Sequence, residues 1–284
     1  MKNNLQQVLY TPESRLRRPG QFFQDMGRDL LASRELAWRL FLRNIRAQYR
    51  QSLLGYFWAF LPPIATTLTF VFLNSQKILN IKATAIPYPA YVMVGTLLWQ
   101  GFVDALNSPI RLMNSSKSML AKINFPREAL ILAGMGEVLF NFMIRLFLMV
   151  FVFFWFKIEI PSTIVLAPAG ILALISLGLT IGILLTPLSM LYQDIGRGLA
   201  FITGFWFFIT PVVYPPPTEW PASLLSNINP VSPLLITTRE MLTTGRISDA
   251  FGFIVVTGSI AVMMSIGWVI YRLAMPHLIE RMSA

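Results

Sequence analysis

The sequence predicts an all-α integral membrane protein with about six transmembrane helices, an N-terminal amphipathic interface helix, and both termini in the cytoplasm. Charged residues make up 13% of the 284 residues and hydrophobic residues 55%, whereas a soluble domain carries about a quarter charged residues. Several stretches that are long enough to cross a bilayer carry no charge. Lysine and arginine gather on one side of the membrane that these stretches define. The surplus apolar surface must therefore face lipid.

The chain divides into three regions. We expect a cytoplasmic N-terminal region with the interface helix over 1–50, a six-span transmembrane domain over 51–275, and a cytoplasmic tail over 276–284. Backbone groups in lipid must bond within their own segment, so each span should be a helix of about 20 apolar residues. The predicted spans are 52–75, 85–107, 129–156, 163–191, 198–214 and 251–273. In the first span, Pro62-Pro63 should cause a kink or end a shorter helix.

One further charge-free stretch, 220–238 (WPASLLSNINPVSPLLITT), is not counted as a span. Pro221, Pro230 and Pro233 would break a spanning helix, and the serine, asparagine and threonine residues make the stretch polar. We expect one or two short amphipathic helices at the outer membrane surface. An ordinary loop is the alternative.

The placement of basic residues sets the predicted orientation. With the N-terminus inside, the inner segments hold seventeen of the 23 lysine and arginine residues, and the outer loops hold five, among them Arg239. This asymmetry places both ends in the cytoplasm. The first 30 residues lack the apolar core of a signal peptide, so we expect the N-terminus to be retained.

The segment 34–50 (RELAWRLFLRNIRAQYR) carries charges at steps of three and four residues, with Ala37, Trp38, Phe41 and Ile45 on the other side. This spacing predicts an amphipathic helix with a basic face. Such a helix can lie flat on the anionic lipids of the inner leaflet, or it can bind a cytoplasmic protein. The inner loop 111–128 is long enough for a second short helix over 114–124, ended by Pro126; a plain connection is the alternative.

Polar residues within the third span form a ladder at steps of four: Glu137, Asn141 and Arg145. Such side chains cost a few kcal/mol each at bilayer depth, so they should face protein or water. The ladder is then either a hydrogen-bonded strut or part of the wall of a transport path. The fourth span carries Gly178 and Gly182 four residues apart, a small-residue face that permits close helix packing.

Several kinds of chemistry have no residues to support them in this chain. The sequence has no G-x-x-x-x-G-K-[ST] phosphate-binding loop, no cysteine, and one histidine, His277. The acidic residues of the transmembrane region lie in separate segments, and no nucleic-acid-binding motif occurs. We therefore predict no catalytic residue, no metal site, no cofactor and no nucleic-acid partner. A membrane enzyme stays open as a minority interpretation, because carboxylates from separate segments can converge in space.

The stretch 43–63 (RNIRAQYRQSLLGYFWAFLPP) resembles the permease subunits of ABC exporters for bacterial surface polysaccharides, such as O-antigen, capsule and teichoic acid. The similarity continues, in order, through 122–128 (KINFPRE), 192–197 (YQDIGR), 206–214 (WFFITPVVY) and Asn229-Pro230. One departure is Gln193-Asp194, where many relatives carry an Arg-Asp pair.

The resemblance implies a transport permease rather than an enzyme, a multi-pass protein of the bacterial inner membrane that forms a homodimer. Two copies of a separate nucleotide-binding ATPase, which holds ATP and Mg²⁺, would drive export of a lipid-linked polysaccharide. In that family the interface helix and the loop after the second span contact the ATPase, and short gate helices precede the last span, which corresponds to 220–238 here. The residues that this assigns to ATPase coupling are Arg39, Arg43, Arg46, Arg50, Lys117 and Lys122.

Aromatic residues supply candidates for the path of the sugar chain, because sugar rings can slide over aromatic faces without tight bonds. The candidates are Tyr56, Phe57, Trp58, Phe60, Trp206, Phe207 and Phe208. Aromatic residues also gather at membrane interfaces for other reasons. Two other functions stay open at this point: an ABC exporter of small molecules or drugs, and a membrane enzyme or ion-coupled carrier.

Overall fold

The computed structural model describes residues 19–50, 55–79, 81, 83–123, 125–192 and 194–283. Helices provide all regular secondary structure within these ranges, which confirms the all-α prediction for them. The α-helices are α1 (Pro19–Arg50), α2 (Leu61–Ser75), α3 (Tyr88–Ser115), α4 (Lys117–Lys122), α5 (Glu128–Trp155), α6 (Ala167–Leu191), α7 (Asp194–Ile209), α8 (Ala222–Ile228), α9 (Val231–Thr243) and α10 (Ala250–Ser283). Two 3₁₀ helices, η2 (Gly55–Ala59) and η3 (Ser162–Leu166), precede α2 and α6.

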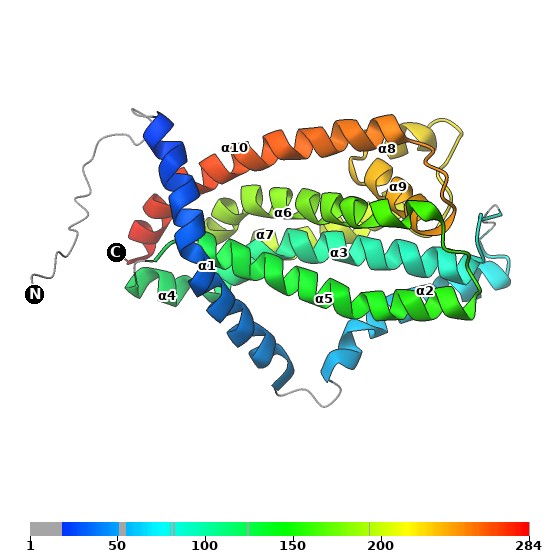
Figure 1. Ribbon diagram of the computed structural model, residues 1–284, viewed down its shortest axis with the longest axis horizontal. Coiled ribbons are helices and arrows are strands. Elements are labelled where there is room, and N and C mark those ends of the chain that lie inside the picture. The colour runs from blue at the N-terminus through cyan, green and yellow to red at the C-terminus, as the bar shows by residue number, and fades with distance from the viewer. Residues whose placement is uncertain are drawn as a thin grey trace, which may run out of the picture.

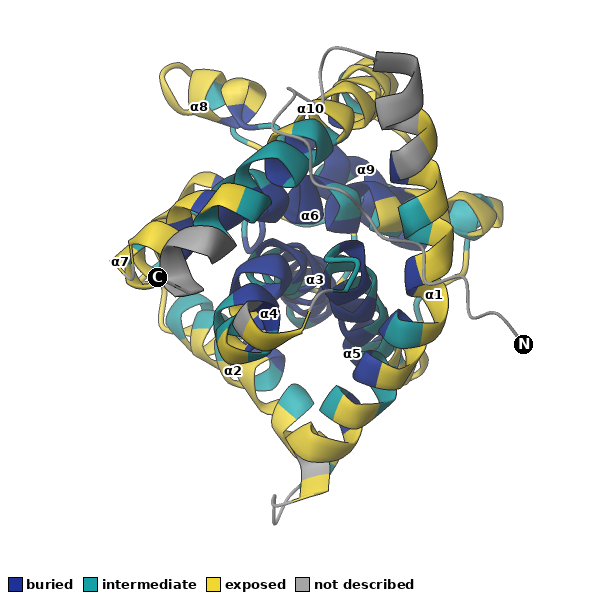
Figure 2. Ribbon diagram, turned by 90° about the vertical axis from the view of Figure 1, so that its left-hand side faces the viewer, coloured by how far each residue is buried: buried dark blue, intermediate teal, exposed yellow. Residues whose placement is uncertain are grey.

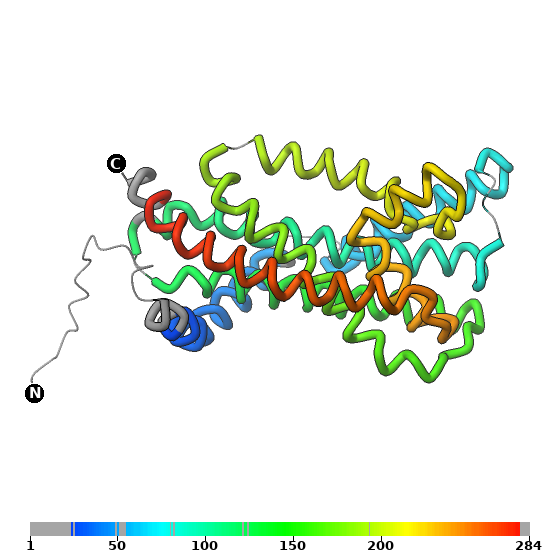
Figure 3. The backbone as a smooth tube through the Cα atoms, turned by 90° about the horizontal axis from the view of Figure 1, so that it is seen from above, coloured from blue at the N-terminus to red at the C-terminus, as the bar shows by residue number. Residues whose placement is uncertain are grey.

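The long helices lie side by side and define the two ends of a bundle (Figure 1). Helix α3 begins at the end where α8 and α9 lie and runs to the end that α1 crosses; α5 runs back, and α6 and α10 again run toward α1. Helix α4 lies at the α1 end. Seen from above, α7 follows one long side of the bundle (Figure 3). The two segments that the sequence assigns to ATPase coupling therefore lie at the same end.

Three helical segments are long and apolar enough to cross a membrane: Glu128–Trp155, Ser162–Leu191 and Ala250–Leu278. They coincide with the predicted spans 129–156, 163–191 and 251–273. Helices α2 and α7 have 15 and 16 residues, fewer than the ~20 of a full crossing, and α3 carries Asp104 and Arg111. The six-span count and the orientation of the termini stay predictions.

The centre of the bundle is a close contact between α3 and α6, which are the most completely buried of the long helices (Figure 2). A Cβ atom added at Gly178 would lie 2.3 Å from the carbonyl oxygen of Phe102, and one at Gly182 would lie 2.4 Å from that of Leu106. The two backbones therefore touch where the sequence predicts a small-residue face, and the packing role of the two glycines is confirmed.

Two expectations for the ends of helices need adjustment. The interface helix begins at Pro19, well before residue 34, so the basic segment 34–50 is only its second half. Pro62 and Pro63 lie in the first turn of α2, where proline is tolerated because the amide hydrogens of that turn have no partner within the helix. The proline pair therefore starts a short helix after η2.

The segment 220–238 forms two short helices, as expected, but α9 does not lie on the surface. Most of α9 is buried, and a Cβ atom added at Gly170 of α6 would lie 2.3 Å from the Thr238 hydroxyl. The Thr238 hydroxyl is satisfied within α9 itself, because it donates to the carbonyl of Leu234 at 2.6 Å. Polar threonines can therefore be buried here without a partner on another helix.

Substitution of Gly182 by alanine should separate α3 from α6 and lower the free energy of unfolding by about 1–3 kcal/mol, the usual cost of overpacking. Denaturant unfolding in detergent micelles would measure this. The matched control is Gly204→Ala on α7, where an added Cβ meets no atom within 4 Å; there the stability should stay equal or rise by up to about 1 kcal/mol. Equal effects of the two substitutions would contradict the close contact.

Candidate functional site

The basic face of α1 is exposed along the second half of the helix. Arg39, Arg43, Arg46 and Arg50 line a shallow open cleft together with Leu42 and Ala47. On the opposite side, Ala37, Leu40 and Ile45 are buried, which confirms the amphipathic prediction. Trp38 is an exception to it, because 60% of this residue is exposed.

The second coupling segment is shorter than expected. Helix α4 covers Lys117–Lys122 within the predicted range 114–124. The Lys117 ammonium donates to the carbonyl of Met190 at 3.3 Å, which ties α4 to the end of α6, whereas Lys122 is exposed. Of the two lysines, Lys122 is thus the one presented to solvent.

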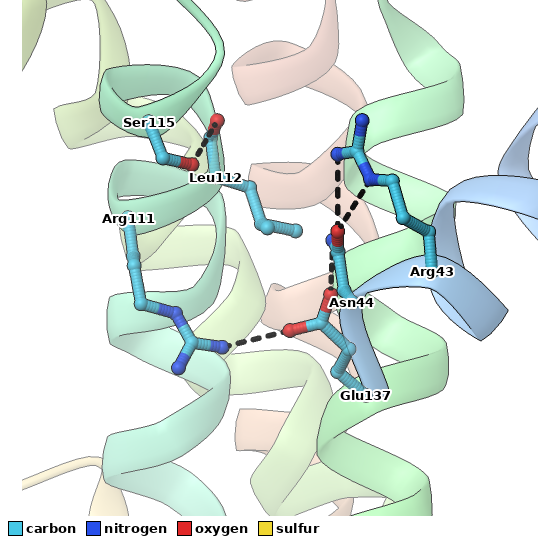
Figure 4. Close-up of polar contacts among 6 residues, drawn as sticks. All are labelled: Arg43, Asn44, Arg111, Leu112, Ser115 and Glu137. Atoms are coloured by element: carbon cyan, nitrogen blue, oxygen red, sulfur yellow. Dashed lines mark hydrogen bonds and ion pairs between the residues drawn. The ribbon is translucent and has the colours of Figure 1, made fainter. Parts of the chain in front are cut away.

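Glu137 of α5 is the point where three helices meet (Figure 4). Its carboxylate accepts a bond from Asn44 Nδ2 of α1 at 2.6 Å and from Arg111 Nη2 of α3 at 2.9 Å. Arg43 in turn donates to Asn44 Oδ1 through Nε and Nη2. The Glu137 side chain is 4% exposed and that of Arg111 is 56% exposed. The prediction that Glu137 faces protein is confirmed.

Asn44 is a residue of this contact that reasoning from the sequence missed. It follows Ala37 by seven residues and Leu40 by four, which places it on the buried stripe of α1. An amide in an otherwise apolar stripe needs a hydrogen-bond partner when it is buried. That single amide was the signal that α1 packs against one of the polar residues of the third span.

The rest of the polar ladder also faces the bundle. Arg145 forms an ion pair with Asp104 of α3, with 2.6 Å between Nη1 and Oδ2, and Asn141 is buried between the two charged positions. The pairs 111–137 and 104–145 join the antiparallel helices α3 and α5 at two levels. This geometry is that of a strut, and a role of the ladder in a transport path stays a prediction.

The candidate aromatic residues fall into two groups at different places. Tyr56, Phe57 and Trp58 are exposed on η2, and Phe60 is half-buried; the Tyr56 ring lies 6.2 Å from that of Phe140 on α5. The second group begins with Trp206, which is half-buried and packs edge-on against Phe102 at 5.4 Å.

The two other members of the second group point in different directions. Phe207 packs against Trp99 of α3 at 5.9 Å and Phe70 of α2 at 6.1 Å. Phe208 is 62% exposed. Of the residues 206–208, Phe208 is therefore the most exposed, and Trp206 and Phe207 are partly buried and pack against the core.

The end of α7 is held in place by Asn229, a residue of the Asn229-Pro230 pair. Asn229 Oδ1 accepts bonds from Trp206 Nε1 at 2.9 Å and from the Val231 backbone N–H at 3.0 Å. Asn229 Nδ2 donates to the Thr210 hydroxyl at 2.8 Å. One amide thus joins α7 to the start of α9.

Arg239 of α9 makes a second attachment to the same segment, and it lies in a buried helix rather than in the loop to which the charge count assigned it. The residue is 3% exposed. Its guanidinium donates to the carbonyls of Val212 and Pro211 at 2.9 and 3.0 Å and lies 3.8 Å above the ring of Tyr91. The signal in the sequence was the position of Arg239, which follows directly after the charge-free stretch 220–238.

Substitution of Arg239 by lysine should lower the free energy of unfolding by about 2–4 kcal/mol, because a buried charge would lose its two-pronged hydrogen bonds and its stacking on Tyr91. Thermal unfolding of the detergent-solubilised chain would measure the loss. Arg246→Lys, at an exposed position shortly after it, is the control and should change stability by less than about 0.5 kcal/mol. Equal stabilities of the two variants would contradict the role given to Arg239.

Comparison with known proteins agrees with this architecture. Residues 35–243 match the ABC-2 type transporter family. The chain is 28% identical over 230 residues to the O-antigen export system permease protein RfbA of Myxococcus xanthus, a match that covers 78% of this chain and 86% of that protein. Two RfbA permease proteins of Klebsiella pneumoniae are 19% and 20% identical, over 72% and 79% of this chain and 79% and 86% of their own lengths.

The matched range begins in the second half of α1 and ends with α9, so it contains the basic face, Glu137, Asn229 and Arg239. It covers well over half of the chain. The resemblance seen in the sequence is therefore confirmed at the level of the family. This chain is a membrane protein of the ABC-2 type transporter family, and hence a transport permease.

Proposed function

We propose that the chain is the transmembrane subunit of an ATP-driven exporter that moves a lipid-linked, O-antigen-like polysaccharide across the bacterial inner membrane. The observation that carries the proposal is the exposed basic face of α1, at the end of the helical bundle where α4 also lies. The chain itself has no phosphate-binding loop. The names of the similar permeases supply the cargo class.

In this proposal the working unit is a homodimer with two copies of a nucleotide-binding ATPase, which hold ATP and Mg²⁺. The ATPase would bind at the α1 and α4 end, where Arg46, Arg50 and Lys122 are exposed. Arg39 is partly neutralised by its ion pair with Glu35 on the same helix, so it should contribute less. Acidic groups on the ATPase would form ion pairs with Arg46, Arg50 and Lys122.

The cargo path would use aromatic side chains that a single protomer leaves uncovered. On α7, Phe201, Phe205 and Phe208 are exposed at steps of four and three residues, which places them on one face. The rings of Phe201 and Phe205 lie 4.7 Å apart. Together with Tyr56, Phe57 and Trp58 they would offer sugar rings a series of flat apolar contacts. Contact with lipid is the competing explanation.

Deletion of the gene should leave lipid-linked polymer on the inner face of the membrane and remove polymer from the cell surface. When the Phe208→Ala variant is expressed in that strain, the amount of exported polymer should be about two- to tenfold lower than with the unchanged chain, because one aromatic contact is lost. Gel analysis of surface polysaccharide, normalised to the amount of permease in the membrane, measures both effects.

The matched control is Phe147→Ala on α5, a phenylalanine that is 75% exposed but lies away from α7. Full export by the Phe147 variant and reduced export by the Phe208 variant would support an aromatic path. Equal export by the two variants would reject Phe208 as a path residue. A deletion strain without accumulated polymer would reject polysaccharide as the cargo.

Reversal of charge at Arg46 and Arg50, each to glutamate, should weaken binding of the ATPase subunit about two- to fivefold, because exposed ion pairs contribute less than about 1 kcal/mol each. The measurement is the amount of ATPase subunit that co-purifies with tagged permease. The control is Arg197→Glu at the start of α7, whose side chain is 87% exposed. If the α1 variant still co-purifies with as much ATPase as the unchanged chain, the docking assignment fails and lipid anchoring accounts for the basic face.

A further inference from the structure

Helix α1 is attached to the bundle by polar contacts at two separate points. The first is the bond from Asn44 to Glu137, which also accepts from Arg111 (Figure 4). The second is Arg272 of α10, which pairs with Asp29 of α1 and lies 3.4 Å from the Glu128 carboxylate of α5. The Arg272 side chain is 10% exposed. Each attachment thus joins α1 to α5, the first directly and the second through Arg272.

The spacing of the two points determines what α1 can do. Asp29 and Asn44 are 15 residues apart, which corresponds to about 22 Å along α1. Glu128 and Glu137 are nine residues apart, or about 13 Å along α5. A helix held at one point can pivot about it, whereas a helix held at two distant points cannot. Helix α1 is therefore fixed in orientation as well as in position.

Close packing surrounds the Glu137 contact. A Cβ atom added at the neighbouring Gly136 would lie 3.1 Å from the ring of Phe41, so α1 and α5 approach each other closely at this level. Ala37 and Leu40 of α1 belong to the same apolar cluster as Leu130 of α5 and Met113 of α3. Separation of α1 from α5 would expose this cluster and leave the Glu137 carboxylate without its α1 donor, which is costly for a buried charge.

We propose that Glu137 is the positioning residue through which a displacement of α1 passes to α3 and α5, so that these three helices move as one body. The inference rests on the proposed function, because the displacement would come from the ATPase bound to the basic face. Arg43 connects the two regions directly: it lines the basic cleft and also bonds Asn44. Glu137 does not touch the cargo in this role.

The test compares leucine substitutions at Asn44 and Glu137 with a glutamine substitution at Glu137. Asn44→Leu and Glu137→Leu should each lower the ratio of export to ATP hydrolysis about three- to tenfold, the range seen for residues that couple distant sites. The double variant should be no worse than Glu137→Leu alone, because Asn44→Leu removes a bond that Glu137→Leu has already removed. The double variant also leaves no buried carboxylate without a donor, so the double variant should fold. Glu137→Gln keeps an acceptor for Asn44 and should stay within about twofold of the unchanged complex.

The control is Glu159→Gln, which removes an exposed carboxylate from the segment that follows α5. It should not change the ratio. Independent, additive losses in the two leucine variants would overturn the proposal. So would equal loss of ATPase binding, membrane level and export in the single and double variants, because that pattern indicates a purely structural role.

A second measurement does not depend on the cargo. The chain has no cysteine, so spin labels can be placed at two introduced cysteines, at Leu31 of α1 and Met143 of α5, both of which are exposed. In the full complex, diluted with unlabelled protomer, the distance between them should be the same without nucleotide and after trapping with ATP and vanadate. In the double leucine variant it should broaden or shift.

A change of that distance in the complex with Glu137 intact would overturn the proposal. The same measurement separates a failure of the proposed function from a failure of the proposed role of Glu137. If the deletion strain accumulates no polysaccharide, the proposed cargo fails, but constancy of the distance still supports Glu137 as the link. If no ATPase co-purifies at all, the proposed function fails, and the Glu137 link cannot be tested by a nucleotide-driven motion. The link is then tested by whether the losses of stability in the two leucine variants are additive.

Discussion

A charged group inside an apolar bundle is stable only when a partner lies within hydrogen-bonding distance, and this requirement organises the chain. Glu137 has donors on α1 and α3, Arg145 has a carboxylate on α3, and Arg239 has two backbone carbonyls at the end of α7. In each case the partner belongs to a different segment of the chain. Each buried charge therefore fixes the distance between two parts of the fold that apolar packing alone would leave adjustable.

The two ends of the bundle use this principle differently. At the α1 end, a buried carboxylate holds a helix whose outer face is basic and exposed. At the opposite end, Asn229 and Arg239 hold the irregular segment that directly follows α7. Helix α1 at one end and the end of α7 at the other are thus each fastened to the core, and the ladder on α5 lies between them.

Much of the fold could be predicted from the sequence because its physical causes are local. Long apolar windows identify α5, α6 and α10, the spacing of arginines identifies the second half of α1, and the cost of polar groups in lipid requires Glu137 to face protein or water. The position of α9 and the burial of Arg239 could not be predicted in this way. Both depend on where α7 ends in space, and a pattern along one segment does not contain the position of another. Asn44 is intermediate: its place in the buried stripe is visible, but Glu137 as its partner is not.

The glycine contacts between α3 and α6 limit where a passage can open. Carbonyl oxygens of Phe102 and Leu106 fill the spaces that Gly178 and Gly182 leave, and a slide by one residue, about 1.5 Å, would bring larger side chains against them. The close contact therefore resists sliding of these two helices past each other. In the homodimer proposed above, an opening for a sugar chain would then form at the outer edge of each protomer, between the subunits. A passage between subunits sets no upper limit on the length of the molecule that is threaded through it.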